Sequence, residues 1–169
     1  HINDDDRVVS VELTNGHDEI IIANRNGRAI RFNEETVRPM GRTATGVRGI
    51  RLDEDGEDVV TGMICVNDPE QETVLVVSEN GYGKRSAVAD YRITNRGGKG
   101  VKTLEVTEKT GKVVAIKAVR DDEDLMIINR SGITIRLRLN EVKVQGRATQ
   151  GVQLNKPKKR GQRISVSYT

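Results

Sequence analysis

The residues best suited to chemistry form a glycine-rich loop at 94–100, with the sequence Thr-Asn-Arg-Gly-Gly-Lys-Gly, between two apolar runs. Glycine has no Cβ atom, so such a loop turns sharply and its backbone can lie close to another surface. Arg96 and Lys99 add positive charge to that surface. The combination predicts contact with a phosphate backbone rather than a place in a hydrophobic core.

The spacing of residues around this loop occurs three times in the chain. A turn glycine follows an apolar run at Gly27, Gly81 and Gly132, which are 54 and 51 residues apart. An arginine stands fifteen residues after each of these glycines, and a Gly-Val pair stands nineteen residues after each. The arginines are Arg42, Arg96 and Arg147, and the pairs begin at Gly46, Gly100 and Gly151. Three copies that share both offsets predict internal repeats, at about 17–66, 71–119 and 121–169, within a single domain that covers 1–169.

Each repeat is expected to form four short β-strands. The chain has one Phe and no Trp, so Val, Ile and Leu must fill its core, which favours strands, and no segment shows a long helical period. The turn glycine joins the first two strands of each repeat in a hairpin, and a long loop precedes the third strand. The expected strands are 19–24, 28–32, 46–52 and 58–66, then 73–78, 82–88, 101–106 and 112–119, and finally 125–129, 133–139, 151–155 and 163–168.

A further strand is expected before the first repeat, because residues 7–13 match the fourth strand of the other repeats. Either residues 7–14 belong to a preceding repeat, or strands are exchanged between neighbours. Repeats of this size predict an all-β, propeller-like array of about three four-stranded blades. Three blades rarely close a ring, so we expect an open arc.

Charge follows the same repeat. The formal net charge is +3, and Lys and Arg are concentrated in the second strand and long loop of each repeat, whereas residues 53–72 carry acidic side chains without Lys or Arg. Blades in register would therefore have a basic rim and an acidic rim. The alternative interpretation is mixed, solvated charge, which recurrence in three repeats makes less attractive.

Several kinds of chemistry are not expected. The Gly-Gly-Lys-Gly run does not meet the nucleotide P-loop pattern, and a single Cys with two His makes a zinc site improbable. Cys65 is interpreted as a small core residue, and the acidic run 121–124 as a solvated turn. We predict no catalytic residue, no metal and no cofactor in this segment. No signal peptide or membrane span is apparent, so a cytoplasmic location is expected.

Residues 37–52, 80–91 and 146–152 resemble the C-terminal domain of the DNA gyrase A subunit. The loop at 94–100 matches the last five residues of that family's Q-R-R-G-G-K-G box, whereas Thr94 and Asn95 replace the first two. The family places this box in its first blade, so the loop is either the box itself or its counterpart in a later blade. The resemblance covers nearly the whole chain.

The resemblance implies a β-pinwheel with strands exchanged between blades. It also implies a non-catalytic segment of an ATP-dependent type II topoisomerase, DNA gyrase, which wraps duplex DNA around a basic outer rim so that strand passage introduces negative supercoils. The implied partners are double-stranded DNA, the gyrase B subunit, together with the rest of the gyrase A subunit, in the bacterial cytoplasm and nucleoid. No membrane partner is implied.

The expected DNA contacts follow from the charge pattern and the resemblance together. Arg42, Arg96 and Arg147 recur at one position and would contact successive phosphates along a curved rim, without reading sequence. Few aromatic residues are present, which argues against single-strand binding. The predicted DNA-binding residues are Arg38, Arg42, Arg48, Lys84, Arg85, Arg96, Gly97, Gly98, Lys99, Gly100, Lys102, Lys143 and Arg147.

Two other interpretations compete with this one. The C-terminal domain of topoisomerase IV shares the blades but lacks a good box. A propeller-type protein-interaction module would carry the basic rim only as solvated charge, and a test of duplex binding separates it from the first two.

Overall fold

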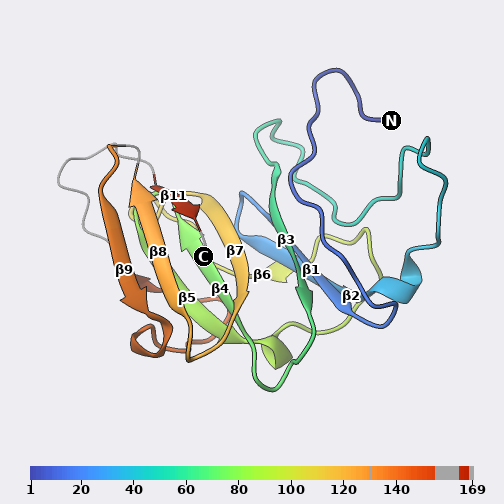
Figure 1. Cartoon of the computed structure of the whole chain (residues 1–169). Helices are drawn as coiled ribbons and strands as arrows, with labels where there is room; N and C mark the ends of the chain where they lie inside the picture. Colours follow the sequence, from blue (N-terminus) through green and yellow to red (C-terminus); the bar gives the residue numbers. More distant parts are fainter. Residues whose placement is uncertain (130, 155–163, 168–169) are drawn as a thin grey trace.

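Three β-hairpins, each closed at one of the recurring glycines, follow one another across the structure (Figure 1). The structure is a computed structural model that describes residues 1–129, 131–154 and 164–167. Gly27, Gly81 and Gly132 have φ angles of 86°, 82° and 80°, a left-handed conformation that favours glycine. The hairpins are β1 (Glu19–Asn24) with β2 (Arg28–Asn33), β4 (Thr73–Ser78) with β5 (Tyr82–Ala87), and β8 (Asp124–Asn129) with β9 (Thr134–Arg138).

A third strand pairs antiparallel with the first strand of each hairpin. These strands are β3 (Val60–Val66), β7 (Val113–Val119) and β11 (Ile164–Ser167). A short 3-10 turn follows the second strand of each hairpin, at η1 (Glu34–Thr36), η2 (Val88–Asp90) and η3 (Leu139–Glu141). The pattern of apolar runs and turn signals therefore predicted these nine strands to within two residues.

The remaining strands are exchanged between neighbouring sheets. The two-residue strand β6 (Val101–Lys102) follows the second hairpin but pairs with β2 of the first, and β10 (Val152–Gln153) pairs in the same way with β5. The resulting sheet orders are β3-β1-β2-β6, β10-β5-β4-β7 and β11-β8-β9. This confirms the all-β fold with strand exchange.

Among the described residues, two of the three buried apolar clusters form layers between successive sheets. Side chains alternate across a strand, so β4 contributes Val74 and Val76 to the layer shared with the first sheet and Leu75 and Val77 to the layer shared with the third. These four side chains are at most 1% exposed. A strand buried on both faces explains why its sequence is a continuous apolar run.

Two expected strands are not formed. Residues 7–14 lie extended without pairing, with Val11 and Leu13 80% and 97% exposed, and residues 46–52 form no strand. The expected strands at 101–106 and 151–155 shorten to β6 and β10. Strands β6 and β10 form because each pairs with the second hairpin strand of the preceding sheet. Among the described residues no preceding sheet lies beside 46–52, so that segment has no strand to pair with. No helix among the described residues is long and apolar enough to cross a membrane.

Candidate nucleic-acid interface

The long loops of the three repeats lie against one another and form a continuous row. Because β6 and β10 return to the preceding sheet, each loop meets the loop before it. The Gly97 N–H donates to the Gly49 carbonyl at 2.5 Å, and the Arg51 N–H donates to the Gly98 carbonyl at 2.8 Å. The equivalent bond joins the next pair of loops, from Glu105 N–H to the Thr149 carbonyl at 3.1 Å. We call residues 37–52, 91–104 and 142–154 the loop row.

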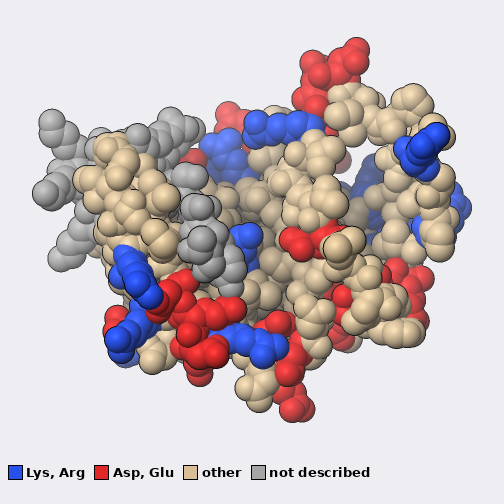
Figure 2. Space-filling view, in the orientation of Figure 1, with Lys and Arg blue, Asp and Glu red and all other residues tan. Residues whose placement is uncertain are grey.

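The loop row contains basic residues and no Asp or Glu within its bounds, and Glu105 follows directly after its second segment. Its cations are Arg38, Arg42, Arg48, Arg51, Arg92, Arg96, Lys99, Lys102, Lys143 and Arg147. All are exposed except Arg96 and Arg147, which are half-buried. Acidic side chains lie in other connections and gather along the lower edge in Figure 2, where β3 joins β4 and β7 joins β8. The basic and acidic segments are therefore separate along the chain, but Lys and Arg of other segments also lie among the acidic side chains of that edge in Figure 2.

Two of the three recurring arginines, Arg96 and Arg147, hold the loops together. Arg96 Nε donates to the Thr36 carbonyl at 3.1 Å, and its Nη1 donates to the Arg48 carbonyl at 3.2 Å. Arg147 makes the same pair of bonds one repeat later, from Nε to the Asp90 carbonyl at 3.1 Å and from Nη1 to the Lys102 carbonyl. A guanidinium has five N–H donors, so each arginine joins two loops and keeps donors for an anion at the surface.

The glycines of the loop at 94–100 allow it to pack closely against the preceding sheet. Gly100 has a φ of 68°, and a Cβ there would lie 2.3 Å from the Ala29 carbonyl oxygen of β2. The Gly97 N–H bonds Gly49. The predicted DNA contact of Gly97 is therefore corrected, because its N–H group is taken by the Gly49 carbonyl, whereas Gly100 serves the close packing of the loop on β2. Gly98 is exposed.

Two predicted DNA-binding residues lie inside the protein, and their assignment was wrong. Lys84 is fully buried, and its Nζ donates to the Gly146 carbonyl at 2.7 Å and to the Arg147 carbonyl. Burial, and secondly the nearby Arg147 charge, lower the pKa of Lys84 to about 8. Arg85 is 4% exposed, pairs with Asp121 and donates from Nε to the Val142 carbonyl at 2.8 Å.

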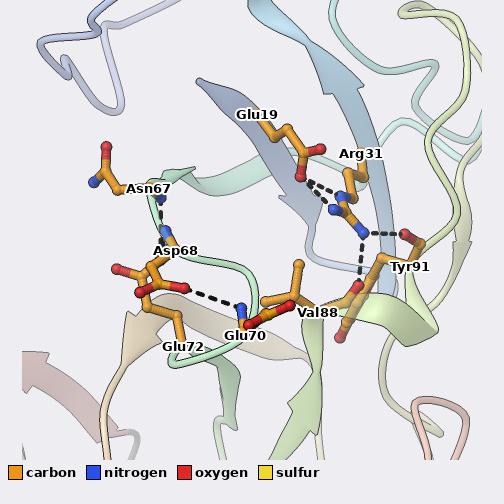
Figure 3. Close-up of polar contacts among 8 residues, drawn as sticks. All are labelled: Glu19, Arg31, Asn67, Asp68, Glu70, Glu72, Val88 and Tyr91. Atoms are coloured by element: carbon orange, nitrogen blue, oxygen red, sulfur yellow. Dashed lines mark hydrogen bonds and ion pairs between the residues drawn. The ribbon is translucent and has the colours of Figure 1, made fainter. Parts of the chain in front are cut away.

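A buried arginine that sequence reasoning did not single out joins the first two sheets. Arg31 on β2 pairs with Glu19 and donates to the carbonyls of Val88 and Tyr91, at 3.0 and 2.9 Å (Figure 3). Arg85 makes the equivalent contact one repeat later. An arginine four residues after each turn glycine, at Arg31, Arg85 and Arg136, was the signal that could have found it.

Six other predicted residues are accessible at the surface. Arg38, Arg42, Arg48, Lys99, Lys102 and Lys143 are exposed in the loop row. Lys102 also pairs with Glu105 at 2.6 Å. A hollow between β2 and the loop at 92–101 is lined by Arg92, Asn95 and Lys99 among others. The row therefore presents cations of three successive repeats on neighbouring loops.

Comparisons with known proteins agree with this architecture. The family described as DNA gyrase C-terminal domain, beta-propeller, matches residues 18–67, 72–120 and 123–168. The DNA gyrase A subunit of Staphylococcus epidermidis is 46% identical over 156 residues, which are 92% of this chain and 17% of that protein. Its counterpart in Staphylococcus aureus is 50% identical over 151 residues, which are 89% of this chain and again 17% of the relative. The chain thus spans a small part of these relatives.

Solved structures show the same fold. A structure of the DNA gyrase A C-terminal domain superimposes with a TM-score of 0.88 at 30% identity, over 98% of this chain and 55% of the other. The C-terminal domain of DNA topoisomerase IV gives a TM-score of 0.89 at 21% identity, over 99% of this chain and 52% of the other. At that lower identity the second likeness concerns the fold alone.

Proposed function

Since the chain belongs to the DNA gyrase C-terminal domain family, we propose that it binds duplex DNA along the loop row and bends it, as a non-catalytic part of a DNA gyrase A subunit. The observation that carries the proposal is the basic loop row, whose loops are joined by backbone hydrogen bonds across three repeats, with Glu105 at the second junction. The sequence matches to the gyrase A subunit favour gyrase over topoisomerase IV, whose likeness is one of fold.

The physical basis is neutralisation of phosphate charge. Lys and Arg that contact phosphates release condensed counterions, which supplies affinity without sequence preference. Bending 20–30 bp through 40–90° costs on the order of 1–6 kcal/mol. Arg48, Lys99 and Lys143 come from three successive loops, so contacts recur along the bend and together offset that cost.

In this proposal the wider reaction belongs to the complete enzyme. The bent duplex is presented to the rest of the gyrase A subunit, the ATP-dependent partner is the gyrase B subunit, and strand passage then introduces negative supercoils. The chain itself contributes geometry and charge, and we assign it no catalytic residue and no cofactor.

We expect a duplex of about 40 bp to bind with an affinity that falls steeply with salt, and to bind more tightly than a single strand of equal length. The double variant Arg38→Ala/Lys99→Ala removes two exposed cations from two loops of the row. The slope of log K against log salt should then decrease by about 2, because each phosphate contact contributes about 0.9. Fluorescence anisotropy over a salt series measures this slope.

The matched control is Lys109→Ala/Arg120→Ala, which removes the same charge from exposed positions outside the loop row. Its slope should stay close to that of the unaltered chain. Absence of duplex binding at low salt, or equal losses in both double variants, would reject the loop row as a DNA surface and favour the protein-interaction module.

A further inference from the structure

The second repeat differs from its neighbours at one buried position. The third residue after the turn glycine is Ile30 in the first repeat and Ile135 in the third, but it is Lys84 in the second. Ile30 is 2% exposed within an apolar cluster, and Lys84 is fully buried. Burying an ammonium group is costly unless it makes specific polar contacts. We therefore expect hydrogen-bond partners for Lys84 that the isoleucines of the other repeats do not need.

Those contacts all lie in the loop of the third repeat. Lys84 Nζ donates to the carbonyls of Gly146 and Arg147, which form the turn beside β5. The neighbouring Gln145 N–H donates to the Arg85 carbonyl at 2.7 Å, so the backbone of the turn is docked on the strand that carries Lys84. In the first repeat, by contrast, an isoleucine side chain lies under the loop and has no group to donate.

The turn that Lys84 holds carries a loop-row arginine. The Arg147 guanidinium reaches back to the carbonyls of Asp90 and Lys102, while its own carbonyl is held by Lys84 Nζ. Main chain and side chain of this one residue are therefore fixed by two different parts of the second repeat. The charged groups that face Lys84 are Arg147 and Asp90, which have opposite signs.

We propose that Lys84 is a positioning residue, which fixes the 146–147 turn through its Nζ donors so that the outer N–H groups of Arg147 are presented to duplex DNA. The effect of Lys84 on DNA affinity rests on the proposed function, whereas the positioning of the turn is supported by contacts within the chain. It assigns the buried lysine an effect on DNA affinity without any contact with DNA.

Protonation provides a signature of this role. Since the docked turn lowers the pKa of Lys84 to about 8, the unfolded or undocked chain binds more protons between pH 8 and the ordinary lysine value of 10.5. Docking therefore tightens as the pH rises through that window. A neutral amine still has two N–H donors for the two carbonyls, so the contacts persist while the cost of burying the charge disappears.

The test is a double-mutant cycle between Lys84→Met and Arg147→Ala, read by duplex affinity at pH 7. Lys84→Met keeps the apolar stem and removes the donors. We expect it to weaken duplex binding about tenfold, the scale of a lost hydrogen bond from a charged donor, and to have no further effect when Arg147 is already alanine. An equal loss in both backgrounds would overturn the proposal. Lys84→Ile, which copies the neighbouring repeats, should behave as Lys84→Met does.

A second readout does not depend on DNA. The Thr149 and Glu105 amides donate across the docked turn, and the Arg51 amide makes the equivalent contact between the first two loops. In Lys84→Met, Thr149 and Glu105 should exchange with solvent about tenfold faster while Arg51 does not change. In the unaltered chain, the NMR shifts of the turn amides should titrate near pH 8.

The two readouts separate this inference from the proposed function. If the unaltered chain fails to bind duplex, the proposed function fails, and amide exchange alone decides the role of Lys84. Unchanged exchange at Thr149 and Glu105 in both Lys84 variants would overturn the inference whatever the DNA result.

Discussion

Replacement of Arg31 by alanine is expected to lower the free energy of unfolding by about 3–5 kcal/mol, the range found when one partner of a buried ion pair is removed. The Arg31 side chain is 9% exposed and that of Glu19 is 18% exposed, so the carboxylate would be left poorly solvated. The carbonyls of Val88 and Tyr91 would lose their donor at the same time. Urea denaturation followed by circular dichroism measures the change.

Arg136→Ala is the matched control, because Arg136 occupies the equivalent position in the third repeat. Its side chain is 74% exposed and pairs with Asp124, so the loss should stay below about 1 kcal/mol, as for surface ion pairs. Arg85→Ala should resemble Arg31→Ala, since the Arg85 side chain is 5% exposed and contacts the third repeat. Similar costs for Arg31→Ala and Arg136→Ala would contradict the inter-sheet role of Arg31.

The repeat and its hairpins could be predicted from the sequence because their signals are local. The left-handed turns at Gly27, Gly81 and Gly132 require glycine, and they follow apolar runs of strand length. The exchange of β6 and β10 could not be predicted in this way, because it depends on which distant segments pair. It was implied by the family resemblance, which the family match and the solved gyrase structure confirm.

The candidate site was predicted in its location but not in its detail. The sequence indicated which loops are basic, yet it could not distinguish Lys99, which is exposed, from Lys84, which is fully buried. A basic side chain on a strand normally indicates a solvated face. Here the middle sheet is covered on both faces. Lys84 and Arg85 are adjacent on one of its strands and point in opposite directions, and both are buried.

The role of the recurring arginines could likewise be predicted only in part from the sequence. Their regular offset indicated a shared role, and contact with phosphate was the natural interpretation for a cation in a glycine-rich loop. The bonds of Arg96 and Arg147 to carbonyls of the preceding repeat add a structural role that no local pattern shows. A variant at either arginine would therefore mix loss of charge with loss of loop order, which is why the salt test above uses Arg38 and Lys99.

Replacement of Gly100 by alanine is expected to cost about 3 kcal/mol of stability and to weaken duplex binding. The left-handed φ of 68° alone costs an L-residue about 1–2 kcal/mol. The added Cβ would also lie 2.3 Å from the Ala29 carbonyl oxygen, a backbone atom that cannot move without disturbing β2. The pairing of Ala29 with Val101 would be lost, and Lys99 would be displaced with it. Urea denaturation and anisotropy measure the two effects.

Two alanine variants separate strain from steric conflict. Gly98→Ala lies in the same loop without a left-handed φ, and its Cβ would meet an Ile30 methyl at an ordinary 3.5 Å, so stability should hardly change. Gly46→Ala keeps the left-handed strain, with a φ of 90°, but has nothing within 4 Å, so about 1–2 kcal/mol is expected. If Gly100→Ala lowers the free energy of unfolding no more than Gly46→Ala does, the requirement for glycine at position 100 does not come from close packing of the loop on β2.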